Sequence, residues 1–97
     1  MQVILESNWS WMLFEEESDF YLSVVCGSSA IFTRELRLSE EEVLAFRNNG
    51  ESALDDIASA VRYRPQHFDD RHIKGFMTRD DVRTAILDWK INHGAKR

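Results

Sequence analysis

Two imidazoles and two carboxylates stand within six residues in the segment 67–72, HFDDRH. Such groups could hold a metal ion or transfer protons, because both kinds serve as metal ligands and as acid–base groups. His67 and His72 are five residues apart, which matches no common zinc motif, and on an extended connector the two rings would face opposite ways. We therefore interpret the segment as a solvated connector. A small hydrolase that uses His67, Asp69 and His72 is kept as a weaker alternative.

Cys26, the single cysteine, ends an apolar run and precedes a turn that begins at Gly27. A nucleophilic thiol needs a base, and no histidine stands near Cys26 in the sequence. Alternation with Phe20, Leu22 and Val24 puts Cys26 on an apolar face, so we expect a buried structural thiol. Phosphate-binding glycine loops, serine nucleophile elbows and paired CxxC motifs are missing from the sequence as well. The sequence thus predicts no enzyme, no catalytic residue, no metal site and no cofactor.

The composition is that of one folded domain. The chain has 97 residues, 43% of them hydrophobic and 30% charged, and two domains of half this length would each be too small to bury a core. We therefore expect a single domain over residues 1–97, with the sheet in 2–38 and the helices in 39–94. Short apolar runs and the lack of a basic segment before an apolar one predict a cytoplasmic protein that is not inserted in a membrane.

Charge is distributed unevenly along the chain, whose net charge is −5. Residues 1–38 and residues 39–62 each carry six acids and two bases, whereas residues 63–97 carry five acids and eight bases. An acidic protein repels polyanions at long range, so nucleic acid is disfavoured as a partner and is kept as a weaker alternative. The basic residues that alternate with aromatic ones are then expected to pair with the acids of the first two helices: Arg62, Arg64, Arg71, Lys74, Arg79 and Arg83.

Four strands are expected in the first third, because short β-branched and aromatic runs alternate with turn residues. The runs are 3–5, 9–14, 20–26 and 30–37. Three short turns connect them, which predicts an antiparallel meander. The run 9–14 is apolar on both sides: Trp9, Trp11 and Leu13 share one face, and Met12 and Phe14 share the other. Its second face is therefore either a partner-binding surface or is buried by loops and termini.

Three helices should follow the strands. Ser39 and Glu42 have the spacing of a capping box, and Gly50 provides a C-terminal stop for this first helix. Residues 52–63 carry one apolar stripe and end before Pro65. The third helix, from about 79 to 93, should bury a face that Leu87 and Ile91 widen. We therefore predict an α+β fold: a four-stranded antiparallel meander sheet followed by three helices packed on one face.

The size, the acidity and the order of these segments resemble the small immunity proteins of bacterial contact-dependent inhibition and polymorphic toxin systems. The residues that carry the resemblance are the Trp-rich hairpin through Trp9 and Trp11, the runs 21–24 (YLSV), 38–42 (LSEEE) and 54–58 (LDDIA), and Gly50. The resemblance implies a non-enzymatic inhibitor that binds a cognate toxin domain. No functional residue is carried over by motif. Toxin nucleases tend to be basic, and an acidic face would complement one.

Our first hypothesis is accordingly an acidic binding protein, an immunity protein of the toxin–antitoxin kind, with a basic toxin domain as its partner. The residues expected to bind that partner are Trp9, Trp11, Glu15, Glu16, Glu17, Asp19, Glu40, Glu41, Asp55 and Asp56. The second hypothesis is a homo-oligomer, such as a homodimer, with a structural or regulatory role and with the Trp-rich sheet face as its interface.

Overall fold

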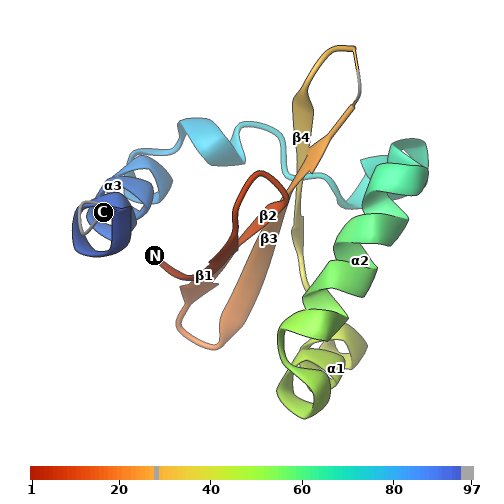
Figure 1. Cartoon of the computed structure of the whole chain (residues 1–97), viewed down its shortest axis with the longest axis horizontal. Coiled ribbons are helices and arrows are strands. Elements are labelled where there is room, and N and C mark those ends of the chain that lie inside the picture. Colours follow the sequence, from red (N-terminus) through yellow and green to blue (C-terminus); the bar gives the residue numbers. More distant parts are fainter. Residues whose placement is uncertain (28, 95–97) are drawn as a thin grey trace.

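The computed structural model describes residues 1–27 and 29–94. Its centre is an antiparallel sheet of four strands in the order β1-β2-β3-β4 (Figure 1). The strands are β1 (Gln2–Ser7), β2 (Trp11–Glu16), β3 (Asp19–Cys26) and β4 (Phe32–Arg37). Neighbours in the sheet are neighbours in the sequence, because each turn is too short to skip a strand. The predicted meander is confirmed.

The helices follow the strands, as predicted. They are α1 (Glu40–Asn49), α2 (Glu51–Tyr63) and α3 (Asp80–Trp89), which continues into a π-helical turn, η3 (Lys90–Gly94). Two short 3-10 helices, η1 (Pro65–Arg71) and η2 (Phe76–Thr78), lie between α2 and α3. The α+β class is confirmed. Within the described part of the chain, no helix is long and apolar enough to cross a membrane.

The capping box at the start of α1 is present. The Ser39 hydroxyl accepts the Glu42 N–H at 3.2 Å, and the Glu42 carboxylate accepts the Ser39 N–H at 2.7 Å. These bonds satisfy two backbone donors that the first turn of a helix leaves without partners. Leu38, just before the cap, is buried, so the start of α1 is fixed against the sheet.

The helices cover both faces of the sheet, which corrects the expectation that all three pack on one face. On the first face, Leu13 and Leu22 lie opposite each other in the register and pack with Leu54 of α2. On the other face, Phe14 packs with Val82 of α3. Figure 1 shows α1 and α2 on one side of the sheet and α3 on the other.

The path of the connector 64–75 is the reason for this difference. Its residues run along the free edge of β4, where the Ile73 N–H donates to the Glu35 carbonyl at 2.8 Å. The chain thereby passes around the edge of the sheet and delivers Phe76 and then α3 to the far face. Phe76 is fully buried, with its ring edge-on to Phe14 at 5.2 Å between centroids and 5.4 Å from Tyr21. The strand that is apolar on both sides is therefore a core strand.

Candidate functional site

Two of the four groups of the segment 67–72 that could do acid–base chemistry, Asp69 and His72, are held in hydrogen bonds to β4. Asp69 accepts a hydrogen bond from Arg34 Nε at 3.2 Å, and His72 Nδ1 accepts the backbone N–H of Glu35 at 3.1 Å. His67 is exposed on η1. Among residues 1–27 and 29–94, no group of three His, Cys, Asp or Glu side chains is arranged to hold a metal ion. The bonds to β4 explain why the segment holds its position against the sheet.

A buried polar pair, which sequence reasoning missed, lies beside His72. Ser23 and Glu35 are each 4% exposed, and the Ser23 hydroxyl donates to Glu35 Oε2 at 2.8 Å. The second carboxylate oxygen, Oε1, lies 4.0 Å from His72 Nδ1. Ser23 and Glu35 are direct cross-strand neighbours, so only the register of β3 with β4 brings them together. Because the pair is closed to solvent, its role is to join β3 to β4 in the interior.

The thiol of Cys26 is buried, as predicted. The residue is 1% exposed, and its Sγ lies 3.6 Å from the carbonyl oxygen of Val24. Burial raises the pKa of the thiol, against the smaller lowering effect of Arg62 and Arg34. A protonated, enclosed thiol is a poor nucleophile, so Cys26 acts as part of the core.

The two tryptophans predicted to anchor a partner lie in different environments. Trp11 is 2% exposed, and its indole N–H donates to the Asp55 carboxylate at 2.8 Å. Trp11 is therefore a core residue, and its assignment to an interface is wrong. Trp9 is 86% exposed and precedes β2, in the β1–β2 turn, with a left-handed backbone at φ 65°. Strand alternation does not extend to a turn residue, which is why the two rings do not share a face.

The sheet face that was a candidate for self-association is covered within the chain. Its Trp11 and Leu13 pack with Leu54, Ala58 and Val61 of α2, so the homo-oligomer hypothesis loses this interface. Phe76 and the buried side of α3 cover the opposite face. Trp9 lies at the margin of that opposite face, where it lines a hollow of about 130 Å³ with Met12, Thr33 and Met77. The sheet thus separates Trp9 from α1 and α2, which carry four of the eight predicted acids.

Several of the predicted acids make contacts inside the molecule. Asp19 accepts a hydrogen bond from Arg37 at 2.7 Å. Glu16 lies 3.8 Å from the N-terminal amino group and 3.9 Å from Arg79. Glu15 is half-buried in β2. Charges that are already paired offer less to a partner, so this part of the predicted acidic face is weaker than the sequence suggested.

The remaining predicted acids are exposed: Glu17 lies in the β2–β3 turn, Glu40 and Glu41 on α1, and Asp56 on α2. Within the described residues, none of these four carboxylates takes part in an ion pair or side-chain hydrogen bond. Glu51, at the start of α2, is exposed as well and was missed by the sequence analysis. We call the exposed acids of α1 and α2 the acidic hairpin surface: Glu40, Glu41, Glu51, Asp55 and Asp56.

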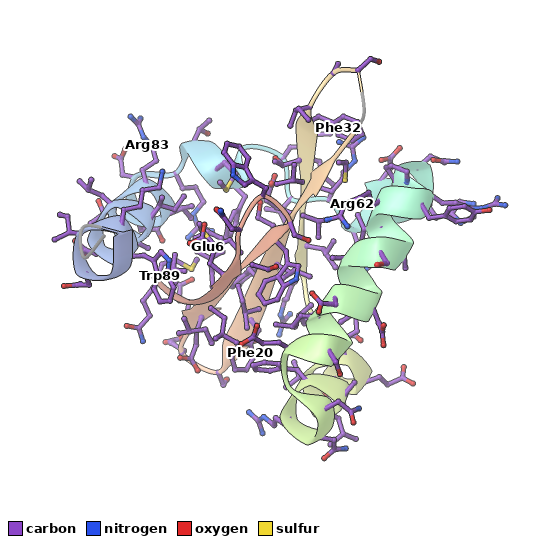
Figure 2. All side chains as sticks on the ribbon, in the orientation of Figure 1. Glu6, Phe20, Phe32, Arg62, Arg83 and Trp89 are labelled. Atoms are coloured by element: carbon purple, nitrogen blue, oxygen red, sulfur yellow. The ribbon has the colours of Figure 1, made fainter. Side chains whose placement is uncertain are left out.

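Two of the bases that could neutralise this surface, Arg62 and Arg71, are used elsewhere, whereas Arg47 is exposed on α1. Arg62 reaches from α2 to the strands (Figure 2), where it donates to the carbonyls of Val25 at 2.8 Å and Ser10 at 3.1 Å. Arg71 donates two hydrogen bonds to Glu42, at 2.6 and 3.1 Å. The expected pairing between the basic last third and the acidic helices is thus present for Arg71. These internal bonds also weaken the interpretation of the basic segment as a nucleic-acid site.

A groove lies between the start of β3 and α1, next to the acidic hairpin surface. Its volume is about 410 Å³, and its lining includes Asp19 and Glu40, two predicted acids that the fold brings together. The apolar lining comes from Phe20, Leu38 and Leu44, and Leu44 is 59% exposed. An apolar floor with a charged rim is the usual anatomy of a protein–protein interface.

Comparison of the chain with protein-family models, with curated proteins and with solved structures gives no match.

Proposed function

We propose that this chain is a non-enzymatic immunity protein that binds and neutralises a basic toxin domain through the acidic hairpin surface. The observation that carries the proposal is the set of exposed carboxylates on α1 and α2 without an internal ion partner. Such charges raise the rate of encounter with a basic protein and disfavour acidic competitors. The toxin as the class of partner follows from the resemblance in size, acidity and segment order.

The groove beside α1 supports a binding function because charge alone gives little holding power. Interfaces keep their partners through apolar side chains that are fully desolvated in a pocket. Leu44, exposed at a groove that Asp19, Glu40, Arg37 and Arg47 also line, offers such a contact to an apolar residue of the partner. In this arrangement the carboxylates orient the basic partner, and the groove slows its dissociation.

The surroundings of the candidate catalytic groups favour binding over hydrolysis. Asp69 and His72 are each bonded to β4, and Cys26 is enclosed in the core. A general acid or base needs to reach a substrate proton. Because these groups are bonded or enclosed, binding at the surface is a better supported function than hydrolysis.

A pair of charge-matched variants tests the proposal by affinity capture from cells of the native host. Glu40→Gln with Asp56→Asn removes two acids of the hairpin surface, whereas Asp70→Asn with Asp80→Asn removes two acids elsewhere. Each pair takes one acid from the first turn of a helix, and each changes the net charge from −5 to −3. Wild type and control should capture the same basic protein, and the hairpin variant should lose it.

The captured protein then decides the immunity role. Its expression should arrest growth, and co-expression of this chain should restore growth in wild-type and control form but not with the hairpin variant. Equal capture by all three forms would contradict the acidic hairpin surface as the interface. A captured protein that is harmless on its own would contradict the immunity role.

A further inference from the structure

α3 carries an exposed apolar side in addition to its buried one. Val82 and Ala85 are buried against the sheet, whereas Leu87 is 59% and Ile91 60% exposed. The sequence-based expectation that Leu87 and Ile91 widen the buried face is therefore wrong. Figure 1 shows α3 at the outer end of the molecule, on the far side of the sheet from α1 and α2. Nothing in the described part of the chain covers this side of the helix.

Four exposed side chains of α3 have the spacing against which a facing helix packs. Asp80, Arg83, Thr84 and Leu87 line a surface hollow of about 500 Å³. These residues stand at positions i, i+3, i+4 and i+7, which is the diamond of four side chains that holds one knob of a facing helix in a coiled coil. With Asp80 and Leu87 as d positions and Thr84 as an a position, the seam follows the heptad spacing, and Ile91 stands at the next a position, in the π-turn η3.

The charges beside this seam are sorted by sign. Arg83 and Lys90 occupy the g positions on one flank, and Asp88 occupies the e position on the other. Arg83 and Asp88 lie about 140° apart around the helix, so they cannot pair with each other in one chain. Both are exposed, and neither side chain has an ion partner among residues 1–27 and 29–94. Figure 2 shows Arg83 extending upward from α3 in this view.

We infer that α3 pairs in parallel with α3 of a second copy of this chain, in a twofold-symmetric dimer. In a parallel pair, a g residue meets the e residue five positions later in the other helix. Arg83 of each copy then faces Asp88 of the other, which gives two reciprocal ion pairs. In an antiparallel pair, flanks of the same sign would meet instead. The seam carries Asp80, Thr84, Leu87 and Ile91 of both copies, with Asp80 exposed at its N-terminal end.

The dimer is weak and leaves the acidic hairpin surface free. The described helical segment has only 15 residues including the π-turn, and its seam buries less than the ~1,200 Å² typical of stable complexes. The association should therefore depend on concentration. Since α1 and α2 lie across the sheet from α3, the inference is independent of the proposed function, and either can fail alone.

Sedimentation equilibrium over a range of chain concentrations tests the association. The wild type should shift from monomer to dimer as the concentration rises. Leu87→Asp should abolish the shift, whereas Leu44→Asp should leave it unchanged, since Leu44 on α1 is equally exposed at 59%. A wild type that stays monomeric, or equal loss in both variants, would overturn the inference.

Charge exchange and cross-linking test the parallel geometry. Arg83→Asp should weaken the dimer about tenfold, and Arg83→Asp with Asp88→Arg should restore it. Thr84→Cys and Ile91→Cys, tested separately, should each form a disulfide between copies, because each residue meets its own counterpart in a parallel pair. Cys26 is 1% exposed and stays out of the reaction. No restoration by the double exchange, or cross-linking at one position only, would refute the parallel seam.

Discussion

Replacing Phe76 by alanine measures how much the second face of the sheet contributes to stability. Phe76 is fully buried between Phe14 and Tyr21 and is the first residue that the connector delivers to this face. If the face were a surface kept for a partner, removing the Phe76 ring would hardly change the free energy of unfolding of the isolated chain. If the face is core, as in the structure, Phe76→Ala should lower this free energy by one of the largest amounts of any single substitution.

The expected cost of Phe76→Ala follows from the burial and the ring contacts. The lost transfer free energy is about 2 kcal/mol for a fully buried ring relative to alanine. A cavity of about 100 Å³ adds about 2 kcal/mol at ~24 cal/mol per Å³, if the surroundings do not collapse. The edge-on contact with Phe14 contributes up to about 1 kcal/mol more. The sum of about 4 to 5 kcal/mol compares with about 5 to 15 kcal/mol for the unfolding of a whole domain of this size.

Urea denaturation, followed by tryptophan fluorescence, measures this cost. The midpoint should fall strongly with little change in slope, and the thermal midpoint should fall by about 15–30 °C. Trp9→Ala is the control, because Trp9 is an aromatic residue that is 86% exposed, and it should change the free energy of unfolding by less than about 0.5 kcal/mol. A cost below about 1 kcal/mol for Phe76→Ala would refute the two-sided core.

Three further substitutions or measurements test individual contacts. Burial alone would raise the pKa of Glu42, but hydrogen bonds from Arg71 and the helix N-cap outweigh it and lower this pKa. Glu42→Gln should therefore cost about 2 kcal/mol at neutral pH. The difference from wild type should begin to shrink as the pH falls below the ordinary pKa of a glutamate, 4.5, and should vanish only below the lowered pKa of the folded chain, where the carboxylate is protonated in both states; a difference that stays constant through this acid range would contradict this. Cys26 should react with a thiol reagent at least about a hundredfold more slowly in the native chain than in denaturant, and similar rates would show that it is not enclosed. Ser23→Ala should lower the free energy of unfolding by about 1–3 kcal/mol because Glu35 loses a buried donor, and an unchanged denaturation midpoint would show that the pair contributes nothing.

The strands and the helix starts could be read from the sequence because short-range interactions determine them. Turn residues every few positions require the chain to reverse, and each strand then pairs with its predecessor. The capping box joins Ser39 to Glu42, three residues away, within a single turn of helix. Cys26 was placed correctly since alternation along one strand relates it to Val24.

The acidic candidate site was only partly readable from the sequence. The excess of acids in α1 and α2 follows from counting residues. The sequence does not say which acids are already paired, and the fold pairs Asp19 with Arg37 and gives Asp55 the indole N–H of Trp11. Whether a charge is free depends on partners far along the chain, so the surface available for binding emerged only from the tertiary structure.

The sequence by itself determined the meander, the order of the helices and the acidic bias of the first two. The tertiary structure alone decided which face each helix covers, because that choice depends on the passage of the connector 64–75 around the edge of β4. The same passage turns Phe14 inward and leaves Leu87 outward on α3. Hydrophobic periodicity in the sequence predicts that a helix has an apolar side. Only packing between distant segments decides which residues of that side reach the core and which remain exposed.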